Sequence, residues 1–66
     1  MYSVLLFSIG HLQQTCAAHW PEQMHPWAAI FLADYLRGYI EAQEFMRLFA
    51  MVNSDYIELA ACIVGQ

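Results

Sequence analysis

The chain has 66 residues, of which 61% are hydrophobic and only 12% are charged. A domain of this length buries only about 60% of the surface that its unfolded chain exposes, so we expect the excess apolar surface to meet a second copy, another protein or a membrane. Two cationic side chains against six carboxylates give a net charge of −4. This balance all but excludes direct nucleic-acid binding, which needs clustered Lys and Arg.

The first expected element is a helix that begins after Ser3 as its N-cap and ends before Pro21. At 100° per residue, one side of this helix is apolar and the other is polar. The apolar side consists of Leu5, Leu6, Ile9, Leu12, Cys16 and Trp20. A strand over residues 2–9 is the alternative, but the sequence offers no second strand with which it could pair.

The apolar amino terminus raises the questions of secretion and of membrane insertion. Residues 1–9 resemble the apolar region of a signal peptide, yet no Lys or Arg precedes them and polar residues follow at once. A membrane-spanning helix needs about 20 apolar residues, whereas the strictly apolar stretch Ala28 to Ala33 is far shorter. We therefore expect a cytoplasmic protein.

Residues 19–25 form the expected connection, and Pro26 then stands where proline is favoured, at the first position of a helix. The apolar pattern continues from there to Val52, which predicts one long central helix over residues 26–52, roughly 40 Å in length. Gly38 would lie inside it, at a cost of about 1 kcal/mol relative to alanine. With Ala42 it forms a small pair that lets another backbone approach closely, or it is a tolerated glycine without a packing role.

A stripe of residues on this long helix follows alternating intervals of four and three, the spacing of a helix–helix seam. The stripe comprises Ala28, Leu32, Tyr35, Tyr39, Ala42, Met46 and Phe49. Apolar residues widen it on both flanks, among them Trp27, Phe31, Leu36, Ile40, Phe45 and Met51. Because so much of the helix is apolar, we expect it to be packed on more than one side and to form a homodimer through this seam.

Polar residues at 53–55 end the long pattern, and Ser54 or Asp55 can cap a last helix. Asp55 and Glu58 resemble a capping box, and Gly65 is a stop signal. The apolar face of this helix comprises Tyr56, Leu59, Ala60 and Ile63. The sequence thus predicts a single all-α domain over residues 1–66, a helical hairpin with a short third helix, assembled as a dimer.

The two cysteines are too few for a disulfide scaffold, so we expect Cys16 and Cys62 to be reduced and buried. An alternative is a metal or haem site that uses Cys16, His19 and His25. Their spacing matches no closed zinc motif, and we expect no cofactor.

No constellation of side chains indicates catalysis. None of the serines stands in a glycine-flanked nucleophile elbow. Glu41 and Glu44 could act as paired carboxylates, but Arg37 and Arg47 stand at helical spacing from them, which indicates surface ion pairs. We therefore expect no enzyme.

Without a catalytic or cofactor site, we expect the protein to act through its surface, by binding another protein. We expect a small interaction protein of the inhibitor or anti-activator type, in the style of phage or mobile-element proteins, that occupies a surface of a host protein such as a DNA-binding regulator. Aromatic residues, 15% of the chain, dominate interface hot spots, and acidic residues complement a basic partner surface. A small membrane-associated protein is the alternative, although interfacial helices usually carry Lys and Arg.

We place the partner-binding site on the outer surface of the long helix. Its polar strip and the adjoining tyrosine supply the residues Asp34, Arg37, Tyr39, Glu41 and Glu44. Tyr39 is the expected anchor, because a seam tyrosine brings a hydroxyl that needs water or a partner. The alternative role of Tyr39 is packing within the dimer, and the next candidate site is the loop at 19–27.

Overall fold

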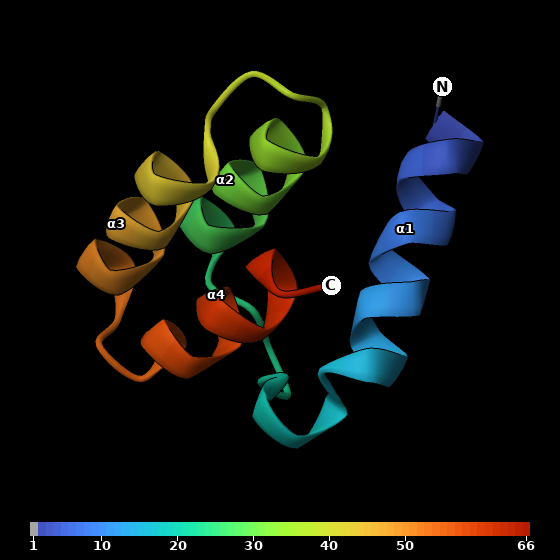
Figure 1. Ribbon diagram of the computed structural model, residues 1–66. Helices are drawn as coiled ribbons and strands as arrows, with labels where there is room; N and C mark the ends of the chain where they lie inside the picture. Colours follow the sequence, from blue (N-terminus) through green and yellow to red (C-terminus); the bar gives the residue numbers. More distant parts are fainter. Residues whose placement is uncertain (1) are drawn as a thin grey trace.

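The computed structural model describes the backbone of residues 2–66 and the side chains of residues 8–66. In this part of the chain every element is helical, which confirms the all-α prediction and excludes the alternative strand. The elements are α1 (Tyr2–Thr15), the short 3-10 helix η1 (Ala17–His19), α2 (Pro26–Leu36), α3 (Ala42–Val52) and α4 (Tyr56–Val64). Figure 1 shows α2, α3 and α4 grouped together, with α1 at their side and η1 leading away from its carboxyl end.

The predicted long helix over 26–52 is wrong, because the chain forms two helices, α2 and α3, joined by residues 37–41. Gly38 has a φ of +84°, the left-handed conformation that glycine adopts at low cost. Its N–H donates to the Tyr35 carbonyl at 3.0 Å, and the Tyr39 N–H donates to the Asp34 carbonyl at 2.9 Å. These two bonds form a Schellman motif, so Gly38 ends a helix instead of lying within one.

The other helix ends agree with the sequence in part. The first helix stops well before Pro21, at Thr15, and it begins at Tyr2, so Ser3 lies inside the helix and the prediction that it is the N-cap is wrong. Before α4, the Asp55 carboxylate makes no capping bond. Instead the Asn53 Oδ1 accepts from the Asp55 N–H at 3.0 Å, which turns the chain between α3 and α4.

The core lies between α2, α3 and α4, with α1 closing one side. A row of aromatic rings joins the three helices: Tyr35 stacks on Phe45 with ring centroids 4.6 Å apart, Phe45 contacts Phe49 at 4.4 Å, and Phe49 contacts Tyr56 at 5.5 Å. Such pairs each contribute about 0.5–1.5 kcal/mol beyond the burial of their area. The buried residues are Leu12, Cys16, Ala28, Leu32, Phe45, Phe49, Tyr56, Leu59, Ala60 and Ile63, which include the whole predicted face of the last helix.

The residues of the predicted seam are divided between α2 and α3, which pack against each other. Ala28, Leu32 and Phe49 are buried in the core of this one chain, and the seam residues Tyr35, Ala42 and Met46 are half-buried. The intervals of four and three therefore serve packing within the chain. They give no support to a dimer, which stays a prediction.

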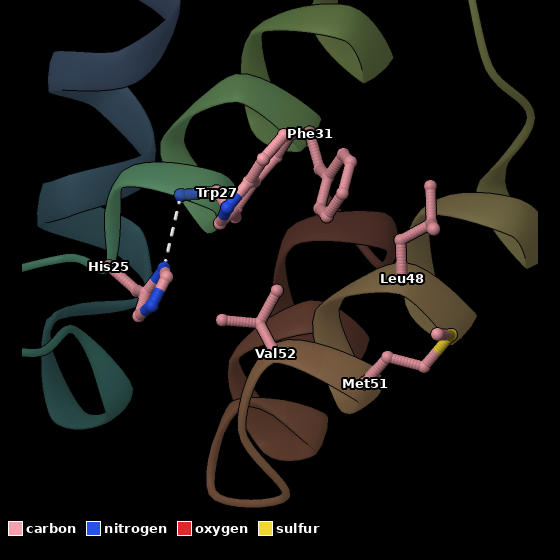
Figure 2. Close-up of a pocket in the computed structure, with 6 residues that line it drawn as sticks. All are labelled: His25, Trp27, Phe31, Leu48, Met51 and Val52. Carbon is pink, nitrogen blue, oxygen red and sulfur yellow. Dashed lines mark hydrogen bonds between the residues drawn. The ribbon is translucent and has the colours of Figure 1, made fainter.

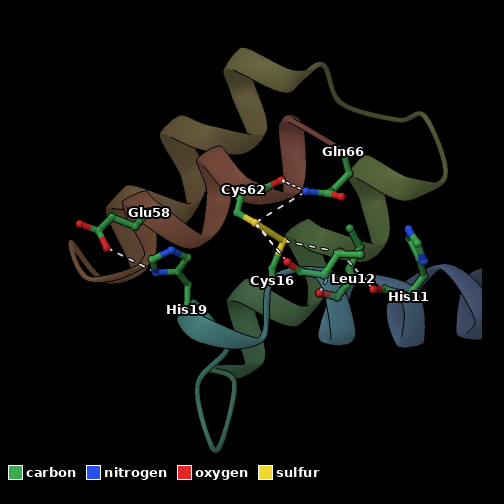
Figure 3. Close-up of a disulfide and its surroundings, with 8 residues drawn as sticks. His11, Leu12, Cys16, His19, Glu58, Cys62 and Gln66 are labelled. Carbon is green, nitrogen blue, oxygen red and sulfur yellow. Dashed lines mark hydrogen bonds and ion pairs between the residues drawn. A yellow bond between two sulfur atoms is a disulfide. The ribbon is translucent and has the colours of Figure 1, made fainter.

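The structure corrects the prediction that both cysteines are reduced. Cys16 and Cys62 form a disulfide with Cα atoms 6.0 Å apart, a distance within the usual range for such bonds. The bond ties the carboxyl end of α1 to α4, as Figure 3 shows. Sequence spacing could not reveal this pairing, because it depends on the return of α4 to η1.

The described helices are short compared with the thickness of a membrane. None of them combines the length and the hydropathy that a membrane span requires.

Candidate functional site

An apolar groove lies on the outer surface where α2 and α3 run side by side. It has a volume of about 380 Å³ and is open to solvent. The residues that line it are His25, Trp27, Phe31, Leu48, Met51 and Val52 (Figure 2). A concave apolar surface of this kind is typical of an interaction site.

Helical spacing explains why these side chains meet. Trp27 and Phe31 are one turn apart on α2, and their rings stack with centroids 6.0 Å apart. Leu48 and Met51 are likewise about one turn apart on α3. The positions that point into the core are the next ones along each helix, such as Ala28 and Phe49, so the groove rows face away from the core.

Large apolar side chains remain uncovered along this groove. Trp27 is 58% exposed and Met51 is 71% exposed, on opposite sides of it. Ile30, one turn before Asp34 on α2, is 48% exposed and extends the apolar surface beyond the groove. No segment of the described chain shields these residues from water, so the surface is available to a partner.

His25 sets the start of α2 and thus the position of Trp27. Its Nδ1 accepts the Trp27 backbone N–H at 3.1 Å, which caps the helix (Figure 2). The His25 backbone N–H donates to the Tyr56 hydroxyl of α4 at 3.0 Å. Pro26 follows at the first helical position, where its missing N–H costs nothing. One end of the groove is therefore fixed by two hydrogen bonds and a proline.

The structure gathers the predicted partner-binding residues around the α2–α3 connection, outside the lining of the groove. Asp34 lies near the end of α2 and Glu44 in the first turn of α3, and both are half-buried. Arg37, Tyr39 and Glu41 lie in the connection itself, where Tyr39 is 75% exposed. The predicted strip along one helix is thus divided among the end of α2, the connection with its exposed tyrosine, and the first turn of α3.

One predicted ion pair is confirmed at the rim of the groove. The Arg47 Nε donates to Glu44 Oε2 at 3.1 Å, and Nη2 donates to Oε1 at 2.6 Å. These hydrogen bonds, together with the charge of Glu44, raise the pKa of Arg47 above its ordinary value. Arg47 Nη1 also donates to the Met51 sulfur at 3.7 Å, so this charged pair lies against one groove residue.

The proposed metal or haem ligands are engaged elsewhere. Cys16 is held in the disulfide, and His25 caps α2. His19 Nδ1 lies 3.4 Å from Glu58 Oε2, an exposed contact between η1 and α4 that Figure 3 shows. Among the residues that the structure describes, no three His, Cys, Asp or Glu side chains come together as a metal site.

Sequence reasoning placed Trp27, Phe31 and Met51 on the flanks of a dimer seam, and it treated His25 as a candidate metal ligand and as part of the loop at 19–27, the next candidate site. The signal that could have identified them is Gly38, because a glycine stop divides the pattern into two helices whose flanks then face each other. Comparisons of the chain with protein-family models, with curated proteins and with solved structures gave no match.

Proposed function

We propose that the protein is a non-enzymatic interaction module that holds an apolar segment of another protein in the α2–α3 groove. The observation that carries this proposal is the exposure of Trp27 and Met51 on the two sides of that groove. Uncovered aromatic and methionine side chains are enriched at protein interfaces, where a few of them supply most of the binding energy.

The charge beside the groove indicates the chemistry of the partner. On α2, Asp34 continues the row of Trp27 and Phe31 at intervals of four and three. On α3, Glu44 precedes Leu48 by four residues and Met51 by seven, so the acidic residues lie at the loop end of the same face. The chain as a whole has a net charge of −4.

The partner segment that fits this face has apolar side chains on one side and Lys or Arg next to them. Opposite net charges would accelerate its encounter with the groove and select it over acidic segments. Tyr39, with Arg37 and Glu41 beside it, offers a second contact at the loop. A protein that covers a basic surface of its partner in this way would act as an inhibitor.

The disulfide bears on where this interaction takes place. Disulfides persist in oxidising surroundings and are rare in the reducing cytosol. The Cys16–Cys62 bond therefore favours an oxidising compartment over the cytoplasmic location that the sequence predicts.

A pair of synthetic helical peptides tests the proposal. One carries leucines at intervals of three and four with flanking lysines, and its counterpart has glutamates in place of the lysines. We expect the lysine peptide to bind and to shift the NMR resonances of Trp27, Phe31 and Met51. Trp27→Ala should weaken its binding about tenfold, equivalent to about 1.4 kcal/mol.

Ile57→Ala is the matched control, because Ile57 is 50% exposed on α4, away from the groove. It should leave the affinity unchanged. Equal affinity for the two peptides, or equal affinity in the Trp27 variant, contradicts the proposal. Light scattering measures whether the protein forms a homodimer. If it does and Trp27→Ala dissociates the dimer, a second copy occupies the groove, and the proposal of a different partner is overturned.

A further inference from the structure

The N-cap of α2 is a histidine, and its capping bond depends on the protonation state of the ring. His25 Nδ1 accepts the Trp27 N–H at 3.1 Å, so in this conformation Nδ1 carries no hydrogen and the ring is the neutral tautomer protonated at Nε2. A second proton turns both ring nitrogens into donors. The Trp27 N–H then loses its acceptor, and a cation stands at the positive end of the helix dipole.

In the described part of the chain, no carboxylate forms an ion pair with the His25 ring. From α4, the Tyr56 hydroxyl is the titratable group that contacts His25, and it accepts the backbone N–H, not the ring. From α3, the groove presents the apolar side chains of Leu48, Met51 and Val52. In the described part of the chain the ion pairs are His19–Glu58 and Arg47–Glu44, and Glu22, exposed in the same loop, forms none with His25.

The capped turn is also one wall of the groove. His25 and Trp27 both line it, and Trp27 stacks on Phe31 at 6.0 Å between ring centroids. Loosening of the first turn therefore displaces the most exposed aromatic side chain of the site. In addition, an imidazolium at the groove repels the basic segment that we expect there.

We propose that His25 is a proton-sensitive switch that closes the groove to its partner as the pH falls through the range in which histidines protonate. The proposal rests on the proposed function, since it concerns regulation of the same groove. Loss of the cap and repulsion of a basic segment act in the same direction, so acid weakens binding.

The first experiment uses the isolated protein and needs no ligand. NMR follows the His25 ring and the Trp27 amide between about pH 8 and pH 5. We expect the Trp27 amide resonance to shift with the same pH midpoint as the ring resonances of His25. Hydrogen exchange in the first turn of α2, corrected for its intrinsic pH dependence, should accelerate about fivefold, which corresponds to the loss of one N-cap.

Two variants decide what causes the response. His25→Asn keeps a capping acceptor that does not titrate, so its Trp27 amide should stay constant over this pH range. His11→Asn, which changes an exposed histidine on α1, should respond as the unchanged protein does. A Trp27 amide that ignores the His25 ring, or a His25→Asn variant that responds like the original protein, overturns the proposal.

The second experiment adds the lysine peptide at both ends of the pH range. We expect its affinity to fall about tenfold on acidification for the unchanged protein and to stay constant for His25→Asn. If the peptide binds equally well at both pH values, the switch is refuted while the interaction function stands. If the Trp27 amide responds but the peptide binds at neither pH, the interaction function and its proposed regulation fail together.

Discussion

The Cys16–Cys62 disulfide is expected to supply a large part of the stability of the fold. It closes a loop between residues 46 apart in the sequence. The loss of chain entropy that such a loop imposes on the unfolded state corresponds to about 4 kcal/mol at 25 °C. A chain of 66 residues typically has a total stability of about 3–10 kcal/mol, so the bond is comparable to the whole.

The site of the bond explains which part of the structure depends on it. On α1, the buried residue of the described side chains is Leu12, and Cys16 follows at the end of the helix with 1% exposure. Without the bond, the side-chain link that remains between η1 and α4 is the exposed pair His19–Glu58, and exposed ion pairs contribute little to stability. We therefore expect α1 and η1 to separate from α4 first when the bond is absent.

Urea unfolding, monitored by circular dichroism, measures this contribution in three samples: the oxidised protein, the protein under a reducing agent, and the double variant with Cys16→Ala and Cys62→Ala. With an m value of about 1 kcal/mol/M, the loss moves the midpoint by about 4 M or unfolds the protein without denaturant. Mass spectrometry confirms the oxidised form, which is lighter by two hydrogen atoms.

The reduced protein and the double variant form the internal control, because both lack the bond but only the variant lacks the sulfur atoms. The difference between them measures packing at Cys16, and their common shift measures the cross-link. Coincident unfolding curves for the oxidised and reduced proteins would refute the prediction that the Cys16–Cys62 disulfide stabilises the fold.

Further predictions concern the helix ends and the core. A Cβ at Gly38 would contact nothing within 4 Å, so Gly38→Ala should lower the free energy of unfolding by about 1–2 kcal/mol through the positive φ alone. Gly10→Ala, in open space within α1, should raise it by about 0.5–1 kcal/mol. Urea unfolding of the two variants measures both changes. Tyr56→Phe removes the acceptor of the His25 N–H and should cost about 1 kcal/mol, with faster hydrogen exchange at that amide. Phe49→Ala, at a fully buried ring, should cost about 3–5 kcal/mol and abolish cooperative thermal unfolding.

The sequence predicted the helical class and the apolar face of the last helix because both follow from local periodicity. Leu59 and Ile63 are buried as their spacing requires. It failed at Gly38, since the penalty for glycine inside a helix is only about 1 kcal/mol and does not forbid a continuous helix. The choice between continuation and a Schellman stop depends on what the two halves gain by packing on each other, which is a tertiary quantity.

The disulfide and the His25 cap could not be predicted from the sequence for a related reason. Cys16 and Cys62 meet only because α4 returns to η1, and His25 is a less common capping residue than Ser, Thr, Asp or Asn. Sequence spacing records neither relation. The Glu44–Arg47 pair, by contrast, depends only on helical spacing, and the structure contains it.

The stop at Gly38 also accounts for the groove. On one long helix, the stripe from Ala28 to Phe49 would face a partner, and Trp27 and Met51 would lie on opposite flanks, far apart along the axis. When the chain turns back at residues 37–41, the two halves of the stripe cover each other, and the flank residues of α2 and α3 become neighbours across a common surface. The turn thereby covers much of the stripe and leaves Trp27 and Met51 exposed on one face of the α2–α3 pair. Because that face begins at a titratable cap and ends beside Asp34 and Glu44, its affinity for a basic segment should depend on both pH and salt, which an apolar seam between two copies would not.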